Sequence, residues 1–380
     1  MATIKHKRGT RAALDASPGL QQGELGLCTD TGELFIGNNG NHPILEQVAA
    51  KTLMGNIGSD KALPSAIPAA DILKMIGAAS NPNLLDNWDF RNPVNQRGET
   101  VYEGITGYVI DRWKLPNSTH QKCELVAGGV KVGAMSGTSL LFPMDLQQII
   151  LLGDGLIGET VTFSFETIEV NSKNCMAIIA FQNSSGTNIS SVSTAKATVP
   201  GIISHTFTIP QGCARISIQL RAADTRASGG DINSSYAIFS RVKLELGSIS
   251  TLENDPPMDY ATELAKCQRY YIRLKPASAS SHSIIGGCAA TISGTQCISL
   301  IPTPVTMRIN PTPNFNGNIA FFEYSNGEQI VRSISSVAVG GVVSNGIYCT
   351  FTITGSQIGR MGFLRTNNDS KAFLEFSADL

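Results

Sequence analysis

The chain has 380 residues, of which 42% are hydrophobic and 16% charged, and its formal net charge is −1. This length predicts two to four domains rather than one, and the balanced charge excludes a general electrostatic attraction to nucleic acid or to anionic membranes. No apolar run reaches the roughly 18–20 residues of a membrane span, and the basic N-terminus is not followed by the apolar core of a signal peptide. We therefore expect synthesis in the reducing cytoplasm and no insertion into a membrane.

The first 43 residues predict a small β module. The stretch GELGLCTDTGELFIGNNG alternates Leu25 and Leu27, then Leu34 and Ile36, about the turn DTG, which is typical of a β-hairpin with one apolar face. Because some forty residues bury little surface alone, we expect this module to lean on copies of itself or on another protein.

Residues 44–82 carry a different pattern. The stretches ILEQVAAKTLMGNI and PAADILKMIGAAS have helical spacing, and prolines at 64, 68 and 82 interrupt them. They predict two short helices that form a neck or linker.

Residues 83–258 predict a jelly-roll-like antiparallel β-sandwich. In CARISIQLRA the residues Ile216, Ile218 and Leu220 share one face, and in SYAIFSRVKLEL one face is expected to hold Tyr236, Ile238, Val242, Leu244 and Leu246. Turn residues separate several such stretches, as in two packed antiparallel sheets. Residues 273–380 repeat this pattern of alternating apolar residues and turns, with hairpin turns at Asn326-Gly327 and Asn345-Gly346. They predict a smaller C-terminal β-sandwich tip.

Between these two parts, residues 259–272 predict a connecting helix. Tyr260, Leu264, Cys267 and Tyr271 are spaced +4, +3 and +4, which makes a narrow apolar stripe, and Asp259 suits the N-cap. One hypothesis is a clamp in which three copies pack this stripe around a common axis. The alternative is a helix that packs on the sandwich of its own chain.

Few patterns in the sequence indicate a catalytic, metal, cofactor or sugar-binding site. The eight cysteines stand singly, without metal-ligand spacing, so we expect buried or free thiols and neither metal nor cofactor. The carboxylate pairs Glu166 with Glu169 and Asp224 with Asp231 suit polysaccharide hydrolysis, but solvated positions explain them better, and we assign no catalytic residue. Trp88, Trp113 and Arg112 are candidates for stacking on a sugar, with a place in the sandwich core as the alternative.

Two stretches resemble modules of bacteriophage tail proteins. The stretch NLLDNWDFRNPVNQRG with YVIDRWKL, LIGETVTFSF and the border VKLELGSISTLENDPPMDYATELAKCQRYY is similar to a tail-fibre β-sandwich domain of the carbohydrate-binding-module type. The N-terminus, with RGT, GELG and TDTG before Ile36-Gly37, resembles the module of tropism-determinant and tail-fibre proteins.

This resemblance implies a virion protein that is a homotrimer. Its N-terminal module (residues 1–43) is then expected to dock on the tail or baseplate, and its distal β domain to bind a surface polysaccharide or protein of the host. Within that domain, loop placement makes receptor-binding candidates of Tyr324, Arg365, Asn367 and Asn368. The alternatives are a tail-associated polysaccharide depolymerase, or a purely structural fibre segment.

Overall fold

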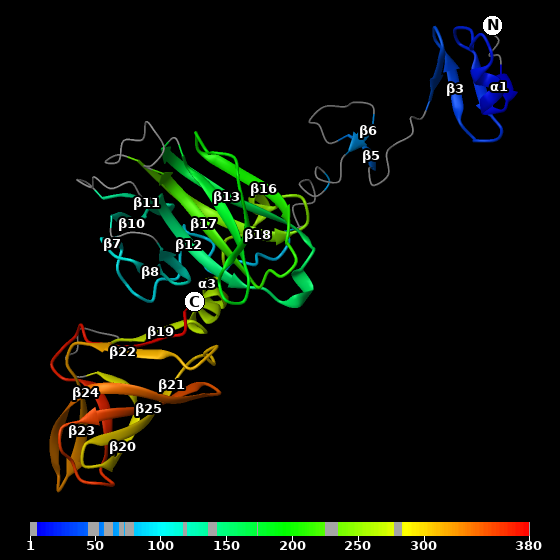
Figure 1. Ribbon diagram of the computed structural model, residues 1–380. Helices are drawn as coiled ribbons and strands as arrows, with labels where there is room; N and C mark the ends of the chain where they lie inside the picture. Colours follow the sequence, from blue (N-terminus) through cyan, green and yellow to red (C-terminus); the bar gives the residue numbers. More distant parts are fainter. Residues whose placement is uncertain are drawn as a thin grey trace. The chain divides into compact units, whose positions relative to one another are not determined.

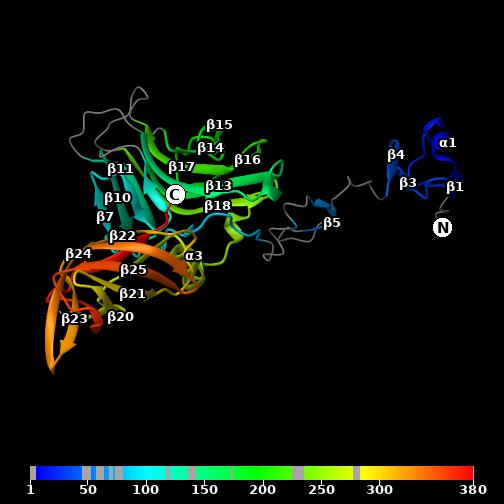
Figure 2. The same ribbon diagram turned by 60° about the horizontal axis from the view of Figure 1, so that its bottom comes forward.

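The computed structural model describes residues 6–44, 53–56, 64–67, 72, 80–116, 120–135, 143–172, 174–224, 235–276 and 283–379. These fall into two units, residues 1–79 and 80–380, which are described separately. Figures 1 and 2 show that strands dominate both, so the mainly β class is confirmed. In the described part of the chain no helix is long and apolar enough to cross a membrane.

The N-terminal module is one small sheet with one short helix. Its strands β1 (His6–Gly9), β2 (Leu25–Cys28), β3 (Leu34–Gly37) and β4 (Asn41–Pro43) lie in that order, and β1 is parallel to β2. The helix α1 (Arg11–Asp15) is capped by Thr10, whose hydroxyl accepts from the Ala13 N–H. The predicted hairpin is confirmed, because β2 pairs antiparallel with β3 about Gly32, where φ is 74°.

The predicted helical neck is wrong in the first expected helix, where the structure describes a strand, whereas Ile72 of the second expected helix is helical. Residues Leu53–Gly55 (β5) pair antiparallel with Ser65–Ile67 (β6), which precede the second expected helix. Gly55, with Pro64 just before β6, weakens the helical tendency, whereas pairing with β5 leaves Ile67 only 6% exposed. Most other residues of the two expected helices lie outside the described part.

The second unit begins with the predicted sandwich. Its two six-stranded sheets, counted over the described residues, have the orders β16-β13-β18-β11-β10-β7 and β15-β14-β17-β12-β9-β8. The strands are β7 (Val101–Glu103), β8 (Gly107–Ile110), β9 (Trp113–Leu115), β10 (Gln121–Val126), β11 (Gly129–Ala134), β12 (Pro143–Leu151), β13 (Thr160–Asn171), β14 (Met176–Gln182), β15 (Asn188–Ser193), β16 (Gly201–Thr208), β17 (Arg215–Asp224) and β18 (Tyr236–Leu246).

The alternation in the sequence predicts the core faces of these strands, with one exception. Ile216, Ile218 and Leu220 are fully buried as expected. In β18 the register against β13 shifts near Ser240, so that Phe239 is buried before the shift and Val242 after it. The expectation of one continuous apolar face along β18 is therefore wrong, because a β-bulge moves the alternation by one residue.

The connecting helix α3 (Tyr260–Gln268) starts at the predicted N-cap, where the Asp259 carboxylate accepts from the Ala261 N–H. It ends earlier than expected, and Tyr271 is the first residue of strand β19 (Tyr271–Leu274). The C-terminal sheet therefore begins before residue 273.

The expected C-terminal sandwich is in fact a closed barrel with a small sheet. The barrel order is β20-β21-β25-β24-β23-β26, and β19, β27 and β22 form the sheet. These strands are β20 (Ile284–Ser293), β21 (Gln296–Pro302), β22 (Thr312–Asn316), β23 (Ile319–Ser325), β24 (Glu328–Val343), β25 (Gly346–Ile353), β26 (Met361–Thr366) and β27 (Phe373–Ser377). Two register shifts let the long β24 bend from β23 to β25, and such bulges allow a sheet to close.

Candidate functional site

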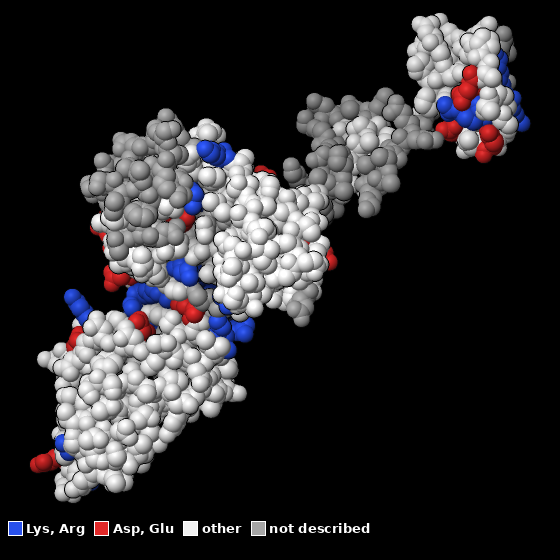
Figure 3. All heavy atoms as spheres, viewed as in Figure 1, with Lys and Arg blue, Asp and Glu red and all other residues white. Residues whose placement is uncertain are grey.

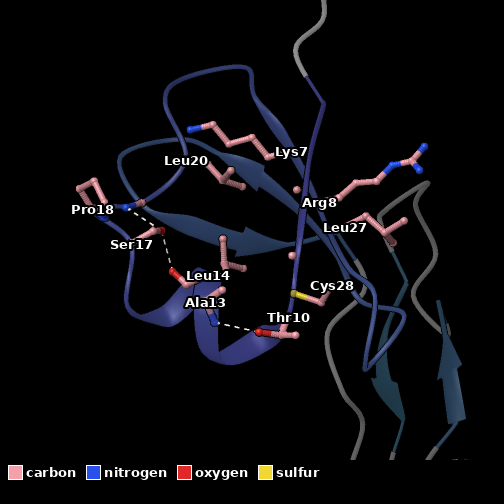
Figure 4. A pocket seen from close by; sticks show the side chains of 13 residues that line it. Lys7, Arg8, Thr10, Ala13, Leu14, Ser17, Pro18, Leu20, Leu27 and Cys28 are labelled. Atoms are coloured by element: carbon pink, nitrogen blue, oxygen red, sulfur yellow. Dashed lines mark hydrogen bonds between the residues drawn. The ribbon is translucent and has the colours of Figure 1, made fainter.

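The N-terminal module has an open pocket between α1, β1 and β2, drawn in Figure 4. Its volume is about 170 Å³, and its walls include the apolar side chains of Leu14, Leu20 and Cys28. Leu20 and Cys28 belong to the small core of the module, against which Leu14 packs. The hydroxyl of Ser17 donates to the Leu14 carbonyl at 2.7 Å. The apolar walls allow the pocket to accept an apolar group.

The opposite face of the β2–β3 hairpin is apolar and open to solvent. Leu25 lies opposite Ile36 and Leu27 opposite Leu34. The exposed fractions are 38% for Leu27, 40% for Leu34 and 39% for Ile36. We call these four residues the hairpin face. Aliphatic pairs at such exposure are typical of a surface that another chain covers.

The three sugar-stacking candidates in the sandwich are buried. Trp113 is fully buried, its indole N–H donates to the Asn87 carbonyl at 3.0 Å, and its ring packs edge-to-face on Phe90. Trp88 is 8% and Arg112 1% exposed. These burials contradict a direct sugar contact and support the alternative, in which the aromatic rings fill the core.

Arg112 instead ties the sandwich to the connecting segment. Its Nε donates to Asp86 at 3.0 Å, its Nη2 donates to the Ile149 carbonyl, and its guanidinium lies 3.5 Å from the centroid of the Tyr270 ring. The backbone φ of Arg112 is 71°, a value that is rare for residues other than glycine.

The connecting helix packs on its own chain. The Glu263 carboxylate accepts from the Asn87 N–H at 2.7 Å. Among the stripe residues, Cys267 and Tyr271 are buried within the chain, whereas Tyr260 is 41% exposed. Burial strongly raises the pKa of the Cys267 thiol. The helix thus packs on the sandwich of its own chain, which was the alternative. A three-fold clamp stays a prediction, and among the four stripe residues only Tyr260 and the half-buried Leu264 are exposed enough to contact other copies.

A buried ionic cluster joins the sandwich to the C-terminal strands. Arg97 donates to Asp111 and to Asp379, each at 2.7 Å, and its guanidinium lies 3.8 Å from the centroid of the Tyr271 ring. Burial raises the pKa of Asp111 to about 6, and burial also raises the pKa of Asp379, although Arg97 opposes both shifts. In this cluster Arg97 therefore favours the ionised form of both carboxylates, which burial opposes.

The four receptor-binding candidates do not form one site. Tyr324, 52% exposed, lies near the β23–β24 turn, where its hydroxyl accepts from the Gln329 amide. Asn367 donates its N–H to the Asn318 carbonyl, and Asn368 follows it in an exposed turn. These asparagines lie at the start of β23, on the order of 20 Å from Tyr324 at the usual rise of a strand. Arg365 packs over the Phe322 ring at 4.7 Å.

Glu166 and Glu169, candidates for a hydrolytic pair, each have a hydrogen-bond partner of their own in the sandwich. Glu166 accepts from Arg241 at 2.7 Å, and the hydroxyl of Tyr236 donates to Glu169. Asp231 lies outside the described residues. Over the part of the chain that is described, no three Asp, Glu, His or Cys side chains lie close enough to hold a metal ion.

An exposed aromatic residue that the sequence analysis did not single out is Tyr348, in β25. The signal was present, because Cys349, Phe351 and Ile353 point inward and the residue before an inward one points outward.

Residues 4–38 match the family model of the major tropism determinant N-terminal domain. The predicted tropism-determinant-like module is thereby confirmed, and the N-terminal part of this chain is a phage tail-fibre module. No curated protein sequence matches the chain.

Several solved structures have partial similarity to this chain, among them the following three. The enzymatically active domain of tailspike protein 4 from bacteriophage CBA120 covers 43% of this chain at 11% identity, with a TM-score of 0.29, and the chain spans only 21% of that structure. The xylan-binding domain CBM22-2 of Xyn10C from Paenibacillus barcinonensis covers 37% of this chain and 94% of its own, with 14% identity and a TM-score of 0.25. The adhesin domain of Epf from Streptococcus pyogenes covers 77% of this chain and 95% of its own length, with 10% identity and a TM-score of 0.26. Similarity at these TM-scores carries no functional argument.

Proposed function

We propose that this chain is a structural phage tail protein that attaches to the tail or baseplate through its N-terminal module and binds a receptor on the host cell surface, a glycan, through its C-terminal β domains. The observation that carries this proposal is the tropism-determinant N-terminal domain at residues 4–38. The protein is then a component of the virion that is made in the cytoplasm of the infected host.

The hairpin face supports assembly into a homotrimer. It exposes Leu27, Leu34 and Ile36 to solvent in a module with a very small core. Covering the exposed part of each of these side chains, 38–40% of its surface, stabilises an assembly by about 1 kcal/mol. In a trimer three weak receptor contacts also act together, which raises the affinity for a cell surface well above that of one contact.

The assembly is tested by the molar mass of the purified chain in solution. We expect a trimer for the wild type and dissociation for Leu27→Asp, which puts a charge on the hairpin face. Gln22→Asp is the matched control, because Gln22 is already an exposed polar residue of the same module. A wild-type chain that is a folded monomer at micromolar concentration would contradict the trimer.

Receptor binding is tested with labelled full-length protein on a panel of bacterial strains. We expect saturable binding to some strains and no release of reducing sugars from their surface polysaccharide. Release of sugars would support the alternative of a depolymerase. Absence of binding to every strain would leave only a structural fibre segment and would overturn receptor binding.

A further inference from the structure

On the outer face of β21, β25 and β24, the ring of Tyr348 packs flat against the surface of the barrel. Tyr348 lies opposite Leu300 on one side and Gly341 on the other, and it is 40% exposed. A Cβ atom placed on Gly340 would lie 2.6 Å from Cδ1 and 3.0 Å from Cε1 of Tyr348. The ring therefore leans across β24 into space that only a glycine leaves open.

Gly346 likewise leaves space for apolar side chains beside the ring. A Cβ atom on Gly346 would lie 2.9 Å from Leu300 Cδ1 and 3.3 Å from Val343 Cγ2. Both apolar side chains remain open to solvent, at 52% for Leu300 and 47% for Val343. Leu300, Val343 and Tyr348 thus make a low apolar surface, which we call the Tyr348 platform.

The strand segments that carry the platform are polar but uncharged. Further along the same strands the Ser336 hydroxyl donates to the Thr352 hydroxyl at 2.8 Å, and Thr350 stands between Thr352 and the ring. All residues of 296–302, 333–343 and 346–353 are described, and none is Asp, Glu, Lys or Arg. Figure 3 shows few charged side chains on the visible side of the barrel.

We propose that the Tyr348 platform binds an uncharged sugar residue of a bacterial surface glycan, with the sugar ring stacked on Tyr348. This inference rests on the proposed receptor-binding function and names its site and ligand class. The C–H groups of a sugar face carry partial positive charge, which the negative face of an aromatic ring attracts. The hydroxyl of Thr350, the next outward residue of β25, can bond to a sugar hydroxyl, and the described residues 296–302, 333–343 and 346–353 hold no cation for an acidic sugar.

A second copy of this chain fits the Tyr348 platform less well than a sugar does. Obligate subunit interfaces resemble a domain core cut in half, and this face interleaves hydroxyls with its three apolar side chains. A mainly apolar surface with a few convergent polar groups is typical of a small-ligand site instead.

The test uses the full-length protein on an array of neutral and acidic bacterial oligosaccharides, followed by titration of the best neutral glycan. Tyr348→Ala is expected to weaken binding about tenfold, the equivalent of one lost aromatic stacking contact. Tyr348→Phe keeps the ring and should bind within about twofold of wild type by the same reasoning. Gly340→Ala should weaken binding because it displaces the ring, whereas Gly341→Ala, whose added Cβ atom meets nothing within 4 Å, is the matched control.

Each other outcome overturns the inference in a distinguishable way. If Tyr324→Ala removes glycan binding and Tyr348→Ala does not, the site is wrong and receptor binding stands. If the chain binds cells but only acidic glycans, or no glycan, the ligand class is wrong. If Tyr348→Ala instead dissociates the oligomer, the platform is a subunit interface. Absence of binding to any cell rejects the proposed function itself.

Discussion

Arg97→Ala gives the sharpest prediction about stability. The Arg97 side chain is 11% exposed and lies between Asp111 and Asp379, whose side chains are 1% and 4% exposed. Removing one partner of a buried ion pair leaves an uncompensated buried charge, which costs about 3–5 kcal/mol. We therefore expect the free energy of unfolding at pH 7.5 to fall by about 3–5 kcal/mol in the variant.

The size of this loss should depend on pH. The pKa of Asp111 in the folded chain is about 6, above its ordinary value of 3.8, so the stability that this group contributes is present below pH 3.8 and is lost as the pH rises through about 6. Without Arg97 the pKa of Asp111 rises further, because Arg97 is the strongest influence that lowers it. At pH 5.5 a larger share of Asp111 is protonated and uncharged in the variant, so the loss should shrink toward about 1–2 kcal/mol for the remaining hydrogen bonds and ring contact.

Urea unfolding followed by tryptophan fluorescence measures both values, since Trp88 and Trp113 lie in the sandwich core. Lys122→Ala is the control, because Lys122 and its partner Glu103 are 33% and 48% exposed and such a pair contributes at most about 1 kcal/mol. An Arg97→Ala loss below about 1 kcal/mol at pH 7.5, or an equal loss at both pH values, would refute the buried-cluster reasoning.

Three further predictions concern other parts of the chain. Gly362→Ala should destabilise the barrel by several kcal/mol, at least about 3, because its Cβ atom would lie 2.0 Å from the Phe322 carbonyl oxygen, and a melting temperature equal to that of Gly341→Ala would contradict this. With a thiol reagent at pH 8 the native chain should show one fast-reacting cysteine, Cys288, since the other seven are buried; fast reaction of several thiols would show that the cores open. Leu264→Asp should dissociate the trimer if the clamp exists, and a trimer with an unchanged melting curve would reject it.

The sequence predicts the parts of this fold that depend on local periodicity. The β2–β3 hairpin, the inward faces of β17 and β25 and the N-cap of α3 follow from alternation, turn residues and capping chemistry. In each case neighbours in the chain decide the structure.

Features that depend on distant pairing could not be predicted in this way. The bulge near Ser240 exists because β18 must match β13, and closure of the C-terminal barrel depends on β20 meeting β26 across some seventy residues. Strand β5 formed in place of a helix because Leu53–Gly55 pair with Ser65–Ile67, where Ile67 is buried, and no short window reveals this pairing. Composition also could not distinguish core tryptophans from surface ones, since the same aromatic residue serves both roles.

The most direct test of the central claim, attachment to a host through this chain, is adsorption of phage particles that carry it. Cells are incubated with an excess of the soluble full-length protein before the particles are added. The proposal predicts that adsorption falls as the soluble chain saturates its receptor, and that Tyr348→Ala protein blocks adsorption less well than wild type. Unchanged adsorption at saturating wild-type protein would contradict the claim.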